Sequence, residues 1–297
     1  MFPNSFRFGN AMRVQRRTFI AGTLGASVAA WANAAATVTP QTPLRIGLTP
    51  VFLDERSGFL GRFRAYFEHA LQQRVMFVQR RSYADVIEQL LNGNLSMAWL
   101  CGYPFVRYAA QMQLVAVPIY QGSPTYRSYI IAGAGITEPQ RFADLRGRTF
   151  AYSDPLSNSG YLFAQSQLAA LGQKDATFFR KSFFAFGHQN VIAAVSQGLA
   201  DAGSVDGYVW DSLAALSPAS TQKTRIVIKS DEFGFPPFVS LKNLNPQLQL
   251  RLRAALVGMK DSAAGRQLLQ ELRLDGFIPG EAALFDSIAA MMRRVGV

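Results

Sequence analysis

A run of small polar residues, Ser153 to Gly160, stands directly before the helix predicted to begin at Tyr161. Hydroxyls, an amide and unpaired backbone N–H groups would meet there at the positive end of a helix dipole, which is the environment that an oxyanion needs. Ser and Asn are also the preferred N-cap residues of helices that bind nothing. The run therefore predicts an oxyanion site, with an ordinary capped loop as the competing interpretation.

Two further junctions between a strand and a helix carry side chains of related chemistry. His188 opens the helix that follows Phe186 and Gly187, and its imidazole could donate to an oxyanion, although a histidine there also serves as a cap or packing residue. Asp206 ends the predicted strand Ala202–Val205. An ionised carboxylate only accepts hydrogen bonds, so beside an anion Asp206 would favour a protonated oxygen or an amine on the ligand. Its alternative role is another N-cap.

The chain contains one cysteine, Cys101, where a predicted strand ends and a helix begins. That setting lowers the pKa of a thiol and makes the thiolate available, whereas the commoner fate of an unpaired cysteine is a small buried hydrophobic residue. One cysteine excludes an intramolecular disulfide and a cysteine-rich metal site. Because His69 and His188 are the only histidines, we expect neither a metal site nor a cofactor.

Short apolar runs alternate with amphipathic stretches after the linker 35–43, which is the pattern of strands alternating with helices. Ser82 and the pair Asn92-Gly93 mark the start and the end of one helix, and Pro104 suits the first turn of another. This first block predicts a helix at Gly58–Gln72 and strands at Leu44–Leu48, Val75–Val78, Leu95–Leu100, Leu114–Tyr120 and Tyr126–Ala132.

A second alternating block follows the polar stretch Gly133–Arg146, which suits a crossing between domains. It predicts strands at Thr149–Tyr152, Ser182–Phe186 and Ala202–Val205 and helices at Tyr161–Leu171 and His188–Gln197. Further helices are expected at Pro246–Met259 with Asn245 as its cap, at Ser262–Arg273 and at Glu281–Val295. The order predicts two α/β lobes, 43–138 plus 230–297 and 139–229, with the C-terminal helices returning to the first lobe.

The first 34 residues have the order of an export signal. Basic residues without an acidic neighbour precede the apolar run Thr18–Trp31, which Ala32-Asn33-Ala34 follows as a cleavage site. The basic residues are Arg7, Arg13, Arg16 and Arg17. The pair Arg16-Arg17 predicts the twin-arginine route and a mature protein in the periplasm, with a retained anchor or a disordered tail as the alternative. No other apolar stretch reaches about 18 residues, so we expect the mature chain to be soluble.

Composition and missing motifs narrow the class of protein. Hydrophobic residues make up 49% of the chain and charged residues 16%, which provides enough apolar surface for two cores. The net charge of +11 suits an anionic ligand, but no stretch concentrates basic residues as a nucleic-acid site would. The chain lacks a Gly-x-Ser-x-Gly elbow, a glycine-rich dinucleotide loop, a P-loop and a His-Glu-x-x-His motif, so we expect a binding protein rather than an enzyme.

The three polar junctions together resemble the periplasmic phosphate/phosphite/phosphonate-binding family of ABC transporters, the PhnD type. The resemblance covers nearly all of the mature chain. It includes Asp144-Leu145-Arg146-Gly147, Ser157-Asn158-Ser159-Gly160-Tyr161, the helix start at His188, Asp201-Ala202-Gly203-Ser204-Val205-Asp206, and the tail Pro246–Leu274. Where the family has Ser-Thr-Ser-Gly, this chain has Asn158 in place of the threonine, so its ligand can differ from the aminoalkylphosphonates of the best-known members.

The resemblance implies a two-lobed type II periplasmic-binding-protein fold, with a mixed sheet flanked by helices in each lobe and the ligand between the lobes. It also implies that the second lobe holds the oxyanion, that aromatic residues of the first lobe close over it, and that Asp206 reads a protonated oxygen. The implied ligand-binding residues are Ser157, Asn158, Ser159, Gly160 and His188 from the second lobe and Tyr103, Tyr126 and Phe52 from the first lobe.

The implied partner is the permease of an ABC transporter, and we expect a monomer that binds no nucleic acid and closes on its ligand like a hinge. An alternative remains open at Cys101, because some relatives that sense arsenite for a membrane histidine kinase are similar here and use a lone cysteine. The sequence does not decide between a permease and a sensor kinase, or among phosphonate, phosphite and phosphate.

Overall fold

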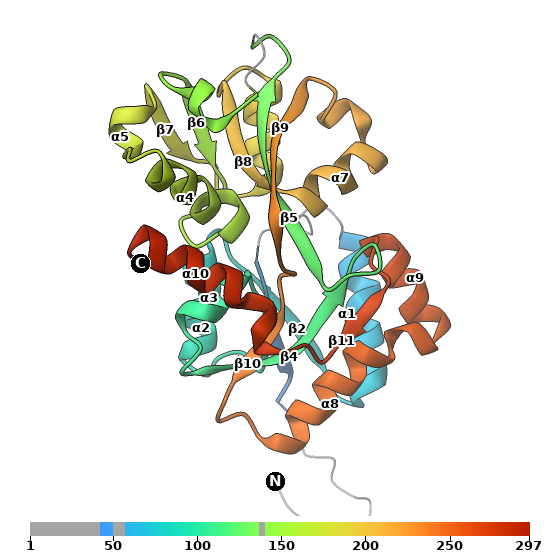
Figure 1. Ribbon diagram of the computed structural model, residues 1–297. Coiled ribbons are helices and arrows are strands. Elements are labelled where there is room, and N and C mark those ends of the chain that lie inside the picture. The colour runs from blue at the N-terminus through green and yellow to red at the C-terminus, as the bar shows by residue number, and fades with distance from the viewer. Residues whose placement is uncertain (1–41, 50–56, 137–139) are drawn as a thin grey trace, which may run out of the picture. The chain divides into compact units, whose positions relative to one another are not determined.

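The computed structural model describes residues 42–49, 57–136 and 140–297, whose helices and strands form two lobes, each with its own mixed sheet (Figure 1). The predicted export signal at 1–34 and the predicted site residue Phe52 lie outside the described residues. No helix in the described part is long and apolar enough to cross a membrane.

The first lobe is built on a six-stranded sheet in the order β11-β4-β10-β3-β1-β2. Strand β1 is parallel to β2 and β3, whereas β10 and β11 are antiparallel to β4. The strands are β1 Leu44–Leu48, β2 Val75–Gln79, β3 Met97–Trp99, β4 Met112–Ile119, β10 Phe238–Leu241 and β11 Gly276–Ile278. The helices are α1 Ser57–Leu71, α2 Tyr83–Leu91, α3 Gly102–Arg107, α8 Pro246–Val257 and α9 Ala263–Leu272.

The second lobe is built on a five-stranded sheet in the order β7-β6-β8-β5-β9. Strand β6 is parallel to both β7 and β8, and β5 is antiparallel to β8 and β9. The strands are β5 Thr125–Gly133, β6 Thr149–Tyr152, β7 Lys181–Phe184, β8 Ala202–Asp206 and β9 Thr224–Gly234. The helices are α4 Phe163–Ala170, α5 Asp175–Phe178, α6 His188–Ser196 and α7 Gly207–Leu216.

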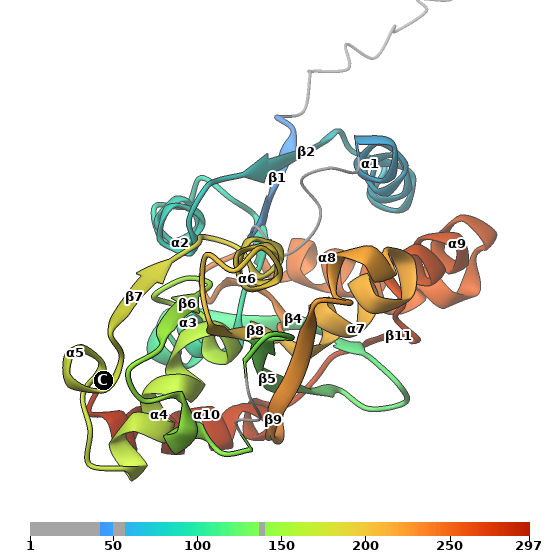
Figure 2. The ribbon, with the colours of Figure 1, turned by 90° about the horizontal axis from the view of Figure 1, so that it is seen from above.

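The chain crosses between the two sheets at points that differ from the predicted lobe boundaries. Strand β5, which we expected in the first lobe, pairs with β8 and β9 and runs beside β9 in both views (Figure 1, Figure 2). The first crossing lies at the tight turn between β4 and β5, where Gln121 and Gly122 have positive φ angles of 51° and 78°. The second follows Gly234 rather than residue 229, since β9 pairs with β5 to its end. The described residues 133–136 and 140–146 therefore stay in the second lobe.

The C-terminal helices do not all return to the first lobe. Helices α8 and α9 contact α1, as predicted. Helix α10, Asp286–Val295, instead contacts α3 of the first lobe and α4 of the second, and Figure 1 shows it between those two helices. This helix therefore belongs to both lobes.

Side-chain caps fix several helix starts where the sequence predicted them. The Ser82 hydroxyl accepts the backbone N–H of Asp85 at 3.2 Å, and the side chain of Asn245 accepts the backbone N–H of Gln247 at 2.9 Å. Each cap satisfies a backbone donor that the first turn of a helix otherwise leaves unpaired. The Ser82 cap matters for the site because the helix that it begins, α2, meets the second lobe at its first residue.

Candidate functional site

Three parallel strands of the second lobe, β6, β8 and β7, end at the same edge of their sheet. The loop Ser153–Gly160 follows β6, His188 opens the helix after β7, and Asp206 is the last residue of β8. The carboxyl ends of parallel strands are where open α/β sheets gather ligand-binding groups. The structure thus brings together the three junctions that the sequence singled out.

The loop after β6 winds into a wide π-helical turn, Asn158–Leu162, which leads directly into α4. The Ser157 hydroxyl caps this turn by accepting the backbone N–H of Gly160 at 2.9 Å. The helix therefore starts at Asn158, earlier than the predicted Tyr161. The wide turn puts the side chains and backbone amides of 157–160 at the start of the helix, where its dipole is positive.

The position of this turn is fixed from behind by two further serine hydroxyls. Ser128 on β5 and Ser204 on β8 both donate to the carbonyl oxygen of Ser159, at 2.7 and 2.6 Å. All three residues are buried. The turn is therefore held in place by the sheet before any ligand arrives.

Three buried polar atoms of this loop have no hydrogen-bond partner among the described residues. They are Ser153 Oγ, Asn158 Oδ1 and Ser159 Oγ. Because buried polar groups in native proteins are nearly always paired, a cluster of unpaired atoms in one loop indicates a place where a polar ligand or water completes the bonding. Ser153 adds a hydroxyl that the sequence analysis did not assign to the site.

Gly160 is required at its position by close packing. A Cβ atom at residue 160 would lie 1.7 Å from Ser153 Oγ and 2.6 Å from Ser153 Cβ. No side chain fits in that space. The glycine therefore lets the Ser153 hydroxyl and the turn share one location.

His188 is a neutral imidazole with a defined tautomer. It is buried, and this burial lowers its pKa to about 3. Its Nδ1 accepts the backbone N–H of Asp206 at 3.1 Å, so the ring hydrogen resides on Nε2. The Nε2 atom lies 3.3 Å from the Tyr83 hydroxyl. His188 can therefore offer a neutral N–H donor at the meeting point of the two lobes.

Asp206 fills the capping role that the sequence left open, and its role toward a ligand stays a prediction. Its Oδ1 caps α7 by accepting the backbone N–H groups of Tyr208 and Val209, at 2.8 and 3.3 Å. Neither bond uses Oδ2, which leaves that oxygen to receive a proton from a ligand. Burial raises the pKa of this carboxyl to about 7, although the two amides act in the opposite direction. Among the described residues of the site, this group titrates closest to neutral pH.

Tyr83 of the first lobe is a site residue that the sequence analysis missed. It is the first residue of α2, its hydroxyl meets His188, and its backbone N–H donates to Asp154 Oδ2 of the second lobe at 3.1 Å. Burial, followed by the charges around it, raises the pKa of the phenol well above its usual value, so it stays neutral. A signal existed, because Ser82-Tyr83 follows a strand and opens a helix in the same way as the junctions of the second lobe.

Tyr126 and Cys101 both contact Asn158. The Tyr126 hydroxyl accepts from the Asn158 side-chain amide at 3.1 Å, but Tyr126 stands on β5 of the second sheet rather than in the first lobe as expected. Cys101, on the first lobe, has its Sγ 3.2 Å from the backbone N–H of Asn158. Burial raises the pKa of this thiol to about 11, which fits the alternative of a small buried residue and not that of an available thiolate. Loss of water around the thiolate outweighs the nearby helix start.

The backbone of Tyr103 bonds the Cys101 thiol, whereas contact of its ring with a ligand stays a prediction. Among the described residues, its hydroxyl accepts from Arg107 of the same helix at 3.3 Å. No group of three or more potential metal-ligating side chains occurs in the described part of the chain.

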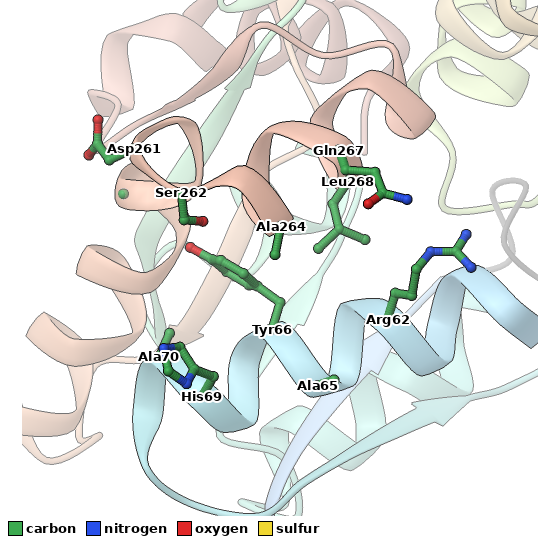
Figure 3. A pocket seen from close by; sticks show the side chains of 11 residues that line it. Arg62, Ala65, Tyr66, His69, Ala70, Asp261, Ser262, Ala264, Gln267 and Leu268 are labelled. Carbon is green, nitrogen blue, oxygen red and sulfur yellow. The ribbon is translucent and has the colours of Figure 1, made fainter.

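A separate cavity of about 540 Å³ lies in the first lobe between α1 and α9 (Figure 3). Its walls include Tyr66, Leu268 and Arg62, and Arg62 is paired with Glu271. None of the site residues described above lines this cavity. The polar cluster between the lobes is therefore the better candidate for an oxyanion.

Residues 46–285 match the family model described as ABC transporter, phosphonate, periplasmic substrate-binding protein. A curated relative, the phosphate-import protein PhnD of Mycolicibacterium smegmatis, is 27% identical over 192 residues, which cover 61% of this chain and 60% of the relative. The match thus spans less than two thirds of that relative's length.

Two solved structures share the fold at 18% identity. One is PhnD1 from Prochlorococcus marinus in complex with methylphosphonate, with a TM-score of 0.76 over 85% of this chain and 98% of that chain. The other is a binding protein component of the ABC phosphonate transporter of Pseudomonas aeruginosa, with a TM-score of 0.79 over 86% of this chain and 87% of that chain. Both confirm the predicted two-lobed α/β fold.

Proposed function

Since this chain belongs to the family of periplasmic substrate-binding proteins of phosphonate ABC transporters, we propose that it captures a small phosphorus oxyanion and delivers it to the permease of such a transporter. The ligand is of the phosphonate, phosphite or phosphate type. The permease is favoured over a sensor kinase because the family is a transporter family. The pair Arg16-Arg17 supports export of the mature chain to the periplasm through the twin-arginine route.

One observation carries the proposal, namely the unpaired buried hydroxyls of Ser153 and Ser159 at the start of α4, beside an unpaired Asn158 Oδ1 that can accept from a protonated oxygen of the ligand. The two serine hydroxyls can donate to an oxyanion at this positive helix start, and neutral His188 carries an N–H on Nε2, which lies 3.3 Å from the Tyr83 hydroxyl. Asp206 can only accept from the ligand when ionised, so the bound form carries a proton on one oxygen or a donor on its substituent. Tyr83 and Tyr126 supply further hydroxyls at the same place.

The arrangement supports binding rather than catalysis. Nucleophilic catalysis needs a hydroxyl next to a base that can take its proton. The Nδ1 atom of His188 is occupied by the backbone N–H of Asp206, and Nε2 carries the ring hydrogen. The imidazole therefore has no free lone pair with which to activate a serine.

Calorimetric titration tests the proposal with methylphosphonate, phosphite, phosphate and sulfate as ligands. The variant Ser153→Ala/Ser159→Ala should bind the best ligand at least about a hundredfold more weakly, because each of the two hydroxyl bonds to an anion contributes about 1.5–3 kcal/mol. Ser212→Ala is the matched control, since Ser212 Oγ is also buried and unpaired but lies on α7 outside the cluster. Above pH 7, where Asp206 is ionised, sulfate has no proton to offer it and should bind far more weakly than phosphite. Equal binding by the double variant would refute the assignment.

A further inference from the structure

The loop that carries the candidate site touches the first lobe through a carboxylate that has no role in holding the ligand. Asp154 follows Ser153 and is buried, with 2% of its surface exposed. Its Oδ1 accepts the backbone N–H of Leu156 in its own loop at 2.8 Å. Its Oδ2 accepts the backbone N–H of Tyr83 in the first lobe at 3.1 Å.

The Tyr83 N–H is the first donor of α2, a nine-residue helix. The Ser82 hydroxyl caps the Asp85 N–H from within the first lobe. The second lobe therefore supplies one of the two side-chain oxygens at this helix start. A negative charge is stabilised at the positive end of a helix dipole, and a backbone donor that loses its partner in a buried place costs free energy.

We propose that Asp154 is the positioning residue that holds the lobes together around the ligand, by capping α2 from the opposite lobe. The inference rests on the proposed function and deepens it. The contact also places the Tyr83 side chain, because the same residue that receives Asp154 at its backbone points its hydroxyl at His188. Asp154 thus couples the approach of α2 to the completion of the oxyanion site.

Asp154→Asn separates this role from a merely local one. Asparagine keeps the Oδ1 acceptor for Leu156, whereas its NH2 group replaces Oδ2 and faces the Tyr83 N–H with a donor. The variant should release methylphosphonate about tenfold faster and bind it about tenfold more weakly, with little change in the association rate. Small-angle scattering of the ligand-free protein should show a larger radius of gyration than the wild type.

Asp144→Asn is the matched control. Asp144 also lies in the second lobe and accepts two backbone N–H groups, those of Gln140 and Arg141, but both belong to its own turn. Its replacement should leave methylphosphonate release and the radius of gyration unchanged. An equal effect of both substitutions would reduce Asp154 to a local loop residue and overturn the inference.

The donor side of the contact can be removed as well. Proline is favoured in the first turn of a helix, and Ser82 has the extended backbone, φ −125° and ψ 159°, that a following proline requires. Tyr83→Ala and Tyr83→Pro both remove the ring, but only proline removes the N–H. Asp154→Asn should therefore widen the ligand-free protein in the Tyr83→Ala background and not in the Tyr83→Pro background. Equal widening in both backgrounds would overturn the inference.

The proposed function and the proposed role of Asp154 can be refuted independently of each other. If the wild type binds none of methylphosphonate, phosphite and phosphate, the proposed function fails, while the scattering comparison still decides the role of Asp154. If the wild type binds but Asp154→Asn behaves like the wild type in release and in scattering, only the role of Asp154 fails.

Discussion

Both lobes present the ends of three parallel strands to the site, but they use them differently. In the second lobe, the ends of β6, β7 and β8 supply a serine-rich turn, a neutral imidazole and a carboxylate, and two serines fix the turn from the sheet. In the first lobe, the described residues after β2 and β3 supply Tyr83 and Cys101, which reach the site by contacting His188 and Asn158. The second lobe thus holds the proposed oxyanion site in a fixed arrangement of its own, and the described part of the first lobe completes it only where the two lobes are in contact.

Gly160→Ala should give the largest effect, because it disrupts the proposed oxyanion site of the second lobe. The added methyl group would collide with Ser153, and overpacking of this kind costs about 1–3 kcal/mol of unfolding free energy in addition to displacing the turn. Denaturant unfolding and calorimetry should show a less stable protein without measurable methylphosphonate binding. Gly61→Ala is the control, since a Cβ there meets nothing within 4 Å, and it should raise the stability by about 0.5–1 kcal/mol.

His188→Ala against Tyr83→Phe compares the lobes directly. His188→Ala removes a proposed ligand donor and leaves the buried Asp206 N–H without its acceptor, so affinity for methylphosphonate should fall about a hundredfold. Tyr83→Phe removes one hydroxyl of the first lobe and should cost about tenfold or less. Calorimetry on both variants checks the ratio. A larger loss of affinity from Tyr83→Phe would mean that the first lobe contributes more of the binding free energy than the second.

The pH dependence of stability sharpens the comparison, because both titrating groups belong to the second lobe. Burial raises the pKa of Asp206 to about 7 and lowers that of His188 to about 3, whereas unfolding returns them to about 3.9 and 6.5. Between about pH 4 and 6.5 the folded protein holds a proton on Asp206 and the unfolded chain holds one on His188, so the two contributions cancel.

Asp206→Asn removes one of the two titrating groups, so the pH dependence that His188 causes is no longer cancelled. Relative to the wild type, the free energy of unfolding should fall by about 1.4 kcal/mol for each pH unit between about 6.5 and 4, because the unfolded chain gains a proton that folded His188 refuses. His188→Asn should show the opposite trend, losing stability relative to the wild type as the pH rises through the same range. Urea unfolding at a series of pH values measures both. Parallel curves for all three proteins would contradict the burial of these groups.

Cys101→Ser should have the smallest effect. The sulfur accepts weak bonds, among them that from the Asn158 N–H, and a serine oxygen can accept them as well, so affinity for a phosphorus oxyanion should change by less than about threefold. Titration with arsenite is the counter-test. Tight arsenite binding by the wild type that disappears in the variant, with no phosphite or phosphonate binding in either, would move the protein to the sensor class.

The local parts of the fold could be predicted from the sequence. β1 and β6 have the predicted bounds, and Ser82 and Asn245 cap the helices that they were expected to begin. Each of these features depends on residues within a few positions of one another, such as a cap and its N–H. The polar junctions at 153–160, His188 and Asp206 could be found for the same reason, since each combines a strand end with a helix start.

Features that depend on distant partners could not be predicted. The sequence of β5 does not say whether it pairs with β4, its neighbour in the chain, or with β8, whose partner residues lie 70 to 78 positions away. The pKa of the Cys101 thiol is raised rather than lowered because burial, which the sequence does not show, outweighs the nearby helix start. Tyr83 and Asp154 were overlooked because their contact joins two lobes, although Gln121-Gly122 did mark the true crossing between the sheets.

Helix α10 has a consequence for how the two lobes can separate. It contacts α3 of the first lobe and α4 of the second. A rotation about the two segments that connect the sheets therefore cannot leave all of these contacts intact. Separation of the lobes must either shift α10 along one of these helices or break its contacts with one of them. The motion therefore has a shear component, in which packed side chains exchange neighbours, and the packing of α10 sets the resistance that opening, and so ligand release, must overcome.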